Sequence, residues 1–313
     1  SEESQVMHPT PRLLAIGEVM AEVRTADGPS DRSGFAVGFA GDSYNTAVYA
    51  ARQMGTAGAV AYMTRIGRDP LSSAWMAVAR AEGIELAHVA LDPDRNIGIY
   101  AVSTDAHGER SFHYWRSDSA ARRLFAVEET AMFMPEADII YLSGITLAIL
   151  SPPARERMTA LLAGRRAGGT LVAFDSNYRP RLWEDAATAR SAMEGLWDLT
   201  DIALPSLDDE MALHGDTSEA AVIDRFAARR WRGIAIKRGV RGPISPQLDE
   251  GAHPDFPSAA KVIDTTAAGD SFNGAYLAAF LAGEAEAARL RAGHDLAAKI
   301  VGVPGAIMPP DTV

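Results

Sequence analysis

The sequence contains no cysteine in 313 residues. Disulfide bonds and zinc sites with thiolate ligands are therefore excluded. It also lacks an apolar run of the roughly 20 residues that a membrane-spanning helix requires. The first residues are polar and contain proline, without the apolar core of a signal peptide. We therefore expect a cytoplasmic protein that makes no contact with a membrane.

Positive charge is scarce as well. The chain has 30 Lys and Arg against 41 Asp and Glu, which gives a formal net charge of −11. Surfaces that bind nucleic acids or anionic membranes need clustered Lys and Arg, so we expect no nucleic-acid partner. An anionic small molecule is compatible with this charge, because a local basic pocket can form in an acidic protein.

The composition that is present, 47% hydrophobic and 23% charged, is ordinary for a globular protein. We expect residues 1–11 to be a disordered lead and residues 12–313 to form a single domain. From residue 137 onward, apolar runs such as "ADIIYLSG" and "TLVAFDSN" alternate with amphipathic segments. Buried strands that alternate with helices predict parallel βαβ units. We therefore predict a three-layer α/β fold, with a doubly wound, mostly parallel sheet and helices on both of its faces.

Helical spacing of apolar residues, with Pro and Gly at segment ends, predicts where the helices lie. They cover residues 42–55, 70–83, 153–168, 186–199 and 219–230, and a buried helix runs from Ser271 onward. Two separated segments, about 18–39 and 96–116, instead alternate between apolar and polar residues, as strands with one exposed face do. The second contains an "AHGE" turn, which predicts a β-hairpin. We expect both segments to pair into a small β-sheet that forms a lid over a cleft.

Two common nucleotide-binding fingerprints are absent. The chain has neither GxxxxGK[ST] nor a GxGxxG that follows a strand, which makes a nicotinamide dehydrogenase a weak hypothesis. In doubly wound sheets, ligands bind beyond the carboxyl ends of the strands, so polar residues that follow apolar runs are the candidates. They lie at 17–18, 143–144, 175–177, 206–210, 237–239 and 264–270.

The stretch "VIDTTAAGDSFNGAY" places Asp270 between an apolar run and a buried helix. One interpretation is that Asp270 caps the helix, because Asp is favoured at helix N-termini. The other interpretation is catalytic. The backbone N–H groups of residues 267–270 would converge at a helix N-terminus and form an anion site. A carboxylate beside a phosphate group then makes sense as a base that takes the proton of an attacking hydroxyl.

Together, two motifs resemble the ribokinase-like (phosphofructokinase-B type) carbohydrate kinases. "DTTAAGDSFNGAYLAAFLAG" is similar to the C-terminal motif of that family, and "AGDSYNTAVYAARQMG" followed by "TRIGRDPLS" is similar to its N-terminal motif. They occur in the family's order, over nearly the whole chain from Leu13, and the pair is far more specific than either motif alone. The resemblance implies Asp270 as catalytic base, with the amides of Ala267, Ala268, Gly269 and Asp270 as an anion hole. It also implies that Gly41, Asp42 and Asn45 bind the sugar.

One position departs from the family pattern. Many members have glycine where this chain has Ala267. Alanine tolerates a positive φ poorly, so we expect the turn to use a conformation that is open to alanine. The anion site would survive the change, because backbone N–H groups need no particular side chain.

Within the family, the chain most closely resembles the kinases of 2-keto-3-deoxygluconate. The segments "IGIY", "YWRSDSAAR", "SGITLAIL", "FDSNYRPRLW" and "LPSLDDE" carry this resemblance. It implies ATP-dependent phosphorylation of the 6-hydroxyl of that sugar acid. The substrate site would contain Gly34, Tyr100, Tyr114, Arg116, Arg179 and Asp270.

The two arginines independently favour an acidic substrate. A guanidinium can hold a carboxylate through two hydrogen bonds, whereas a neutral hexose needs no arginine pair. Arg181 is an alternative to Arg179, and Arg110 is an alternative to Arg116. The two tyrosines alternatively pack only within the hairpin, since aromatic residues are common in strands.

The resemblance also implies ATP and Mg²⁺ as cofactors, and leaves open whether K⁺ is required. "KRGVRG" would form one wall of the nucleotide pocket, although such a glycine loop is often just a turn. The nucleotide-binding residues would be Ser206, Lys237, Gly239, Gly242, Ala267, Ala268, Gly269 and His294, the last of which is alternatively an ordinary helix-face histidine. Asp208 and Glu210 would orient the metal through water.

Two other functions stay open at this point. The runner-up is a kinase for a neutral ketohexose or a nucleoside. A sugar-acid sensor that kept the fold and lost turnover is the alternative from a different class. For the kinase we expect a homo-oligomer whose small-molecule partners are a sugar acid and ATP.

Overall fold

The computed structural model describes residues 12–25, 34–55, 59–104, 110–126 and 133–310. The segment that the sequence predicts to be a disordered lead, and the "AHGE" turn, lie outside these residues. Within them, no helix is both long enough and apolar enough to cross a lipid bilayer.

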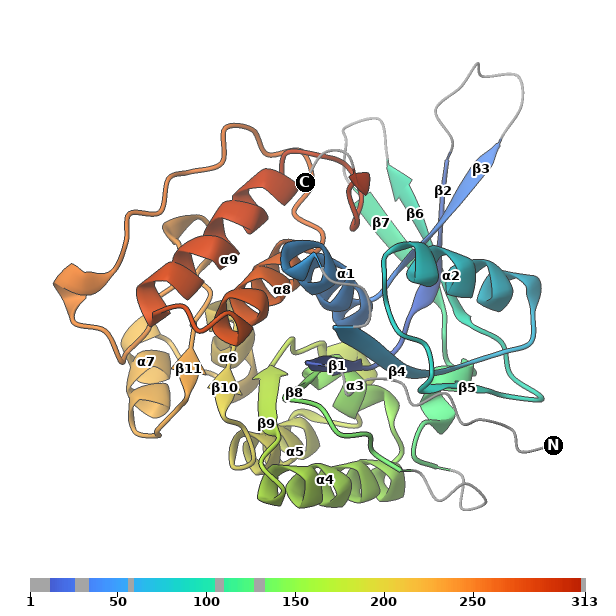
Figure 1. Cartoon of the computed structure of the whole chain (residues 1–313), viewed down its shortest axis with the longest axis horizontal. Helices are drawn as coiled ribbons and strands as arrows, with labels where there is room; N and C mark the ends of the chain where they lie inside the picture. The colour runs from blue at the N-terminus through green and yellow to red at the C-terminus, as the bar shows by residue number, and fades with distance from the viewer. Residues whose placement is uncertain (1–11, 26–33, 56–58, 105–109, 127–132, 311–313) are drawn as a thin grey trace.

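The larger of two β-sheets forms the centre of the molecule (Figure 1). Its seven strands run in the order β11-β10-β9-β8-β1-β4-β5, and their pairings are parallel. Parallel sheets are normally covered on both faces, and all residues of β1 and β4 are accordingly buried. The strands are β1 (Leu13–Ile16), β4 (Val60–Ile66), β5 (Val89–Leu91), β8 (Ile139–Ser143), β9 (Leu171–Asp175), β10 (Ile202–Ala203) and β11 (Gly233–Ile234).

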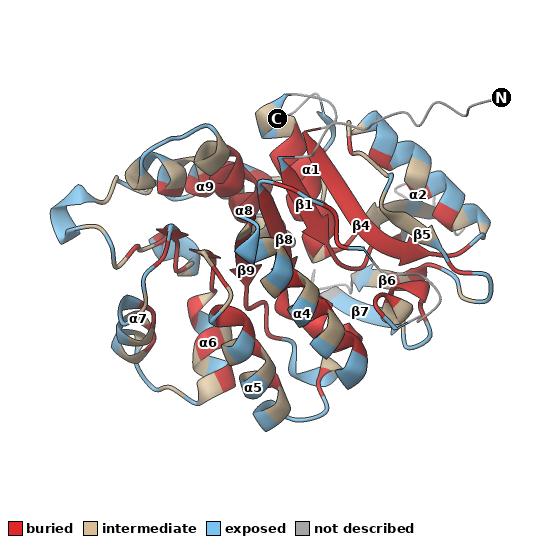
Figure 2. Cartoon of the chain, turned by 60° about the horizontal axis from the view of Figure 1, so that its bottom comes forward, coloured by how far each residue is buried: buried red, intermediate tan, exposed pale blue. Residues whose placement is uncertain are grey.

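Helices cover both faces of this sheet, which confirms the predicted three-layer α/β fold. Successive strand residues point to opposite faces, so Leu13 and Ala15 join one core while Leu14 and Ile16 join the other. Figure 2 shows the buried central strands, with exposed residues on the outer sides of the helices. One helical layer is α1 (Asp42–Met54), α2 (Pro70–Ala81), α8 (Ala268–Leu281) and α9 (Glu286–Ile300). The other is α3 (Gly144–Ile149), α4 (Pro152–Ala167), α5 (Ala186–Trp197), α6 (Leu207–His214) and α7 (Glu219–Ala227).

Most of these helices correspond to predicted ones, and the exceptions are informative. Helices α3 and α6 have only 6 and 8 residues, which give too few turns for helical spacing to be recognised in the sequence. Helix α9 was not predicted either, although it has 15 residues. Helix α8 begins at Ala268 rather than at Ser271, so that Asp270 lies inside its first turn. Short 3₁₀ helices also occur as η1 (Ala120–Arg123), η2 (Pro180–Leu182), η3 (Gly239–Arg241) and η4 (Glu250–Ala252).

The second sheet has four strands and stands off the main body (Figure 1). Its order is β3-β2-β6-β7, with bounds β2 (Met20–Thr25), β3 (Phe35–Ala40), β6 (Gly98–Thr104) and β7 (Arg110–Trp115). β2 pairs antiparallel with β3, and β6 pairs antiparallel with β7. The two hairpins are joined by parallel pairing of β2 with β6. The predicted pairing of the two separated segments is therefore confirmed, and we call this element the lid sheet.

The strand order places a switch point in the main sheet. From β1 the chain first adds β4 and β5 on one side, and later β8 to β11 on the other side. Adjacent connections therefore diverge between β1 and β8, and this is where doubly wound sheets hold their ligands. The residues after β1, β8, β9, β10 and β11 meet at this edge, which faces the lid sheet.

Helices α1 and α8 pack closely against each other next to this edge. A Cβ atom added to Gly274 of α8 would lie 2.8 Å from the carbonyl oxygen of Thr46 and 2.9 Å from the backbone nitrogen of Ala50. Glycine at this position therefore allows the two backbones to approach. Because α1 carries Asn45 and α8 carries Asp270, their spacing also fixes the distance between these two side chains.

We predict that Gly274→Ala destabilises the protein by about 1–3 kcal/mol, because backbone atoms of α1 leave no room for a methyl group. The substitution should also move Asp270 away from Asn45, and any activity that depends on their contact should fall. Gly164→Ala is the matched control, since a Cβ there meets nothing within 4 Å. The free energy of unfolding of this control should rise by roughly 0.5–1 kcal/mol, because alanine has a higher helix propensity than glycine. Urea denaturation measures both, and equal effects of the two variants would contradict the close packing.

Candidate active site

Two adjoining cavities open at the carboxyl ends of the main-sheet strands. One, of about 490 Å³, lies between the lid sheet and the main sheet, and we call it the lid cavity. The other, of about 430 Å³, is lined by residues of the segment after β11 and of α8 and α9, and we call it the helix cavity. Ligands in the two cavities would meet at the N-terminus of α8. The residues that line both are Arg179, Ser206, Asp209, Lys237, Thr265, Ala268 and Gly269.

Asp270 lines the lid cavity and does not cap α8. The N-cap residue is Ala267, and no side chain makes a capping hydrogen bond there. The Asp270 carboxylate instead accepts a hydrogen bond of 2.8 Å from the side-chain amide of Asn45. The structure therefore removes the capping interpretation, because the helix starts before Asp270 and its carboxylate faces another helix.

The conformation of Ala267 differs from the expected one. We expected the turn before α8 to use a backbone conformation that is open to alanine. The φ of 60° and ψ of 13° of Ala267 lie in the left-handed region, which is sterically unfavourable for alanine. Left-handed backbone costs a non-glycine residue roughly 1–2 kcal/mol. Strain of this kind concentrates at functional sites, where the surrounding structure enforces it.

The predicted anion hole is the first turn of α8, where backbone N–H groups lack helical partners. The N–H of Ala268 already donates to the Thr265 carbonyl over 3.2 Å, so a bound anion would have to share this N–H with that carbonyl. Gly269 lines both cavities, and a Cβ at that position would lie 3.6 Å from the Nζ atom of Lys237. A cation and a helix N-terminus thus lie side by side, which favours an anionic group between them.

The pKa of Asp270 is raised to about 7, mainly by burial and further by the Asp42 and Asp175 carboxylates. The Asn45 hydrogen bond and Lys237 oppose this rise of the pKa. A carboxyl group that titrates near neutrality can accept a proton at physiological pH, which general base catalysis requires.

Asp42 and Asn45 both reach the lid cavity from the start of α1. The Asp42 carboxylate accepts hydrogen bonds from the Ser143 hydroxyl and, over 2.8 Å, from the Asn177 amide. Gly41 is the N-cap of α1 with extended backbone. A Cβ there would lie only 2.2 Å from the carbonyl oxygen of Glu18, so the chain needs glycine for close approach.

Asp175 and Asn273 were not assigned a role from the sequence, whereas Lys237 was assigned to nucleotide binding. Asp175 is buried at the end of β9 and accepts a 2.5 Å hydrogen bond from Nζ of Lys237. Asn273 of α8 donates to the same carboxylate over 2.7 Å and accepts from Lys237 over 3.1 Å. Asp175 and Asn273 together hold the lysine ammonium at the junction of the two cavities. The position of Asp175 after an apolar run was the signal, but its partners could not be read from the sequence.

The lid sheet contributes Tyr100, Tyr114 and Arg116 to the lid cavity. Tyr100 and Tyr114 are cross-strand neighbours with ring centroids 5.7 Å apart. Buried Tyr100 donates its hydroxyl hydrogen bond to Glu22, whereas Tyr114 is exposed toward the cavity. Both tyrosines therefore line the cavity while also packing on each other, so the two interpretations of them are compatible. Phe112 is a further lining residue that the sequence analysis did not single out.

The arginine predictions separate clearly in the structure. Arg179 lines both cavities and contacts Asp209 at 3.2 Å, whereas Arg181 is exposed and lines neither. Arg116 lines the lid cavity, and the side chain of its alternative, Arg110, lies outside the described part of the chain. Gly34 is exposed before β3 and lines neither of these two cavities.

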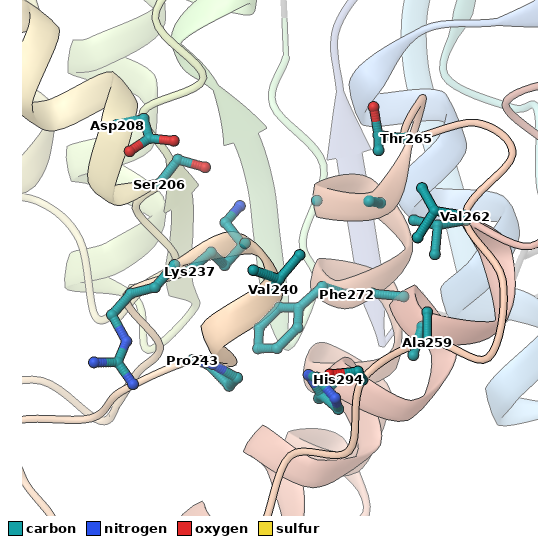
Figure 3. A pocket seen from close by; sticks show the side chains of 18 of the residues that line it. Ser206, Asp208, Lys237, Val240, Pro243, Ala259, Val262, Thr265, Phe272 and His294 are labelled. Atoms are coloured by element: carbon teal, nitrogen blue, oxygen red, sulfur yellow. The ribbon is translucent and has the colours of Figure 1, made fainter.

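The helix cavity contains most of the predicted nucleotide-binding residues (Figure 3). Ser206, Lys237, Gly239 and His294 line it, and apolar Phe272 and Val240 lie between them. His294 is buried, and its Nε2 atom lies 2.7 Å from the Pro257 carbonyl oxygen.

Ala267, which was predicted to bind the nucleotide, lines the lid cavity and not the helix cavity. Gly242, which was also predicted to bind it, does not line the helix cavity. Its φ is 76°, a left-handed conformation that favours glycine. A Cβ at this position would also lie 2.6 Å from the side chain of Phe256. Glycine at this position therefore allows the turn and leaves room for the Phe256 side chain.

The metal prediction needs a correction. Asp208 lines the helix cavity, but Glu210 is fully buried and lines neither cavity. Glu210 contacts Arg225 at 3.4 Å, and burial raises the pKa of Glu210 to about 7. Asp209, which the sequence analysis passed over, lines both cavities instead. Among the described residues, no group of three acidic or histidine side chains forms a closed metal cage.

Comparisons with known proteins find similar proteins over nearly the whole chain. Residues 10–313 match the family model described as "pfkB family carbohydrate kinase". The chain is 38% identical over 306 residues to 2-dehydro-3-deoxygluconokinase of Escherichia coli K12, covering 95% of this chain and 97% of that one. The crystal structure of a PfkB protein from Polaromonas sp. JS666 superposes with a TM-score of 0.77 at 26% identity, over 95% and 98% of the two chains. A putative ribokinase II from E. coli, solved in complex with ATP and Mg²⁺, shares the fold with a TM-score of 0.77 at 21% identity, over 95% and 94%.

We predict that Ala267→Gly stabilises the protein by about 0.5–1 kcal/mol, because glycine adopts left-handed backbone without the steric cost. Ala268→Gly is the matched control. It removes the same methyl group one residue later, inside the helix, and should destabilise by up to about 1 kcal/mol. Chemical denaturation of both variants measures the difference. Destabilisation of similar size in both would show that Ala267 is not strained.

Asp270 should make stability depend on pH. Its folded-state pKa lies above the value of about 3.9 expected in the unfolded chain. Between these two values the unfolded state releases the proton while the folded state keeps it, so wild-type stability falls as the pH rises from about 4 to 7. Asp270→Asn lacks this loss and should be more stable than wild type by roughly 2–4 kcal/mol above pH 7. Equal pH profiles of unfolding for both proteins would contradict the raised pKa.

Proposed function

Because this chain belongs to the pfkB family of carbohydrate kinases, we propose that it phosphorylates 2-keto-3-deoxygluconate, also called 2-dehydro-3-deoxygluconate, on the 6-hydroxyl with ATP. The observation that carries the proposal is the content of one cavity. Asp270, with its raised pKa, shares the lid cavity with Arg116 and Arg179. The relatives named for this activity, at 38% identity over almost the whole of both chains, support the same substrate.

In this proposal Asp270 is the general base. The sugar acid lies in the lid cavity with its 6-hydroxyl at Asp270, and its carboxylate lies toward the arginines. Asp270 takes the hydroxyl proton as the oxygen attacks the γ-phosphorus of ATP, and the bond from that phosphorus to the oxygen of the β-phosphate breaks, which releases ADP. Asn45 fixes the carboxylate of Asp270 in the direction of the cavity, since its amide already donates to one carboxylate oxygen.

The nucleotide occupies the helix cavity, with its phosphates at the first turn of α8. The apolar surfaces of Phe272 and Val240 suit a purine base, and Lys237 is held by Asp175 where the phosphates would pass from one cavity to the other. The amides of α8 and the ammonium of Lys237 would stabilise the charge that develops on the phosphoryl group.

A magnesium ion would neutralise phosphate charge in this reaction. Asp208 and Asp209 fit that ion, because Mg²⁺ keeps several waters and uses only one or two carboxylates beside the phosphates. Asp208 is exposed at the mouth of the helix cavity, and Asp209 faces both cavities. Glu210 has no such access, because its side chain is buried.

A kinase for a neutral ketohexose is the second candidate, and one observation favours it. Both arginines already have acidic partners, Glu18 for Arg116 and Asp209 for Arg179. With a neutral sugar bound, each arginine would therefore still have a countercharge from the protein.

Asp270→Asn should lower kcat for the sugar acid by about 10²- to 10⁴-fold, the usual contribution of a positioned general base. The KM for the sugar acid should change little, because the asparagine keeps the shape and can still accept the Asn45 hydrogen bond. A coupled assay that follows ADP formation measures both constants. A variant that keeps more than a tenth of wild-type turnover would exclude Asp270 as the base.

The substrate is tested in the same assay with the wild-type protein. 2-Keto-3-deoxygluconate should give the highest kcat/KM, above its C1-alcohol analogue, which has a CH₂OH group in place of the carboxylate, and above fructose. Robust turnover of fructose with none of the sugar acid would instead establish the second candidate.

A further inference from the structure

Glu18 lies where the chain passes from the main sheet to the lid sheet, between β1 and β2. Its side chain is only about 1% exposed, although it carries a charge. A buried carboxylate is costly unless it is paired and hydrogen-bonded. Its partners therefore indicate why it is tolerated there.

Both partners of Glu18 come from the place where the chain returns from the lid sheet. Arg116, directly after β7, donates from Nη2 to one carboxylate oxygen, and the Ser119 hydroxyl donates to the other over 2.5 Å. Gly98 leaves room for this arrangement, since a Cβ there would lie 2.9 Å from Oε1 of Glu18. Glu18 thus fixes the guanidinium of Arg116 at the wall of the lid cavity.

The guanidinium keeps donors for a ligand in this position. A guanidinium has five N–H donors, of which the Nε–H is buried and out of a ligand's reach and one on Nη2 is used by Glu18. The other Nη hydrogens are the donors that a ligand can use. Arg116 lines the lid cavity while its side chain is only 11% exposed. A planar guanidinium can contact one carboxylate with one edge and a second carboxylate with another.

We propose that Glu18 is a positioning residue that sets how strongly the lid cavity prefers a sugar acid over a neutral sugar. The inference rests on the proposed function, in which Arg116 holds the substrate carboxylate. Glu18 orients the guanidinium, and at the same time it supplies the countercharge that a neutral sugar lacks. It therefore lowers the penalty for a neutral sugar, whereas a sugar acid brings a countercharge of its own to Arg116.

Glu18→Gln separates the two effects of this residue. The glutamine amide oxygen can accept from Arg116, and its NH₂ group can donate to the Ser119 oxygen, so the orientation of Arg116 is kept and the charge is lost. A neutral sugar then leaves Arg116 without a countercharge in a site that excludes most water. The sugar acid supplies that charge itself.

The measured quantity is the ratio of kcat/KM for 2-keto-3-deoxygluconate to kcat/KM for its C1-alcohol analogue. Glu18→Gln should raise this ratio about tenfold over wild type, because an unpaired buried charge penalises only the alcohol complex. In the Arg116→Ala background, the same change at Glu18 should leave the ratio within about twofold, because Glu18 acts through Arg116.

Glu22 provides a matched control. It is likewise a buried acid and lies in β2, but its partners are the neutral Tyr100 hydroxyl and, at 4.0 Å, the exposed Arg24. Glu22→Gln should leave the ratio within about twofold, since it removes no countercharge of Arg116. Glu18→Asp keeps the charge but withdraws it from the guanidinium, and should raise the ratio by less than Glu18→Gln does. It also serves as the test if Glu18→Gln does not fold, which thermal unfolding reveals.

The outcomes are distinct from those for the proposed function. A wild-type protein that does not prefer the acid over the alcohol contradicts the proposed function itself. A wild-type preference for the acid that neither Glu18 variant increases overturns the role of Glu18 alone. An equal rise of the ratio in Glu22→Gln would also overturn it, because the effect would then follow from any loss of negative charge in the lid sheet.

Discussion

The site depends on the close approach of three carboxylates, of which Asp175 is buried while Asp42 and Asp270 are half-buried. Asp42, Asp175 and Asp270 lie near enough that the first two raise the pKa of the third. Amides from α1, α8 and the loop after β9 donate to them, and Lys237 supplies positive charge. Such a cluster costs folding stability, because charges and desolvation oppose it. In the proposed reaction, the gain is a base that can accept a proton near neutral pH.

The main sheet makes this cluster possible by its topology. Strand ends that are far apart in the sequence meet at the switch point, and the N-termini of α1 and α8 point at the same place. Glycine at positions 41 and 274 lets backbones approach where a methyl group would collide. A displacement of either helix would therefore separate the acids from their amide donors, so the packing of α1 on α8 and the chemistry of the site are one constraint.

The lid sheet adds a second group of charges behind the residues that line its cavity. Glu22 accepts from Tyr100, and Glu18 accepts from Arg116. Each acid is buried, and each contacts a side chain that lines the lid cavity. The polar lining of the lid cavity is thus preorganised from within the sheet, which reduces the cost of ordering side chains when a ligand binds.

The sequence by itself determined the fold class, the lid segments and the interest of the turn before α8. Hydrophobic periodicity predicted the first two, and a local motif indicated the third. The sequence placed Asp270, Asp42, Asn45 and Arg179 at the cavities, but it could not place Glu210. Successive helical residues turn by about 100°, so Glu210 points away from Asp208, toward Arg225. Only the tertiary structure decided the pKa of Asp270 and the pairing of Glu18 with Arg116, which are 98 residues apart. Burial and charge pairing depend on neighbours in space, and packing brings those neighbours together from distant parts of the chain.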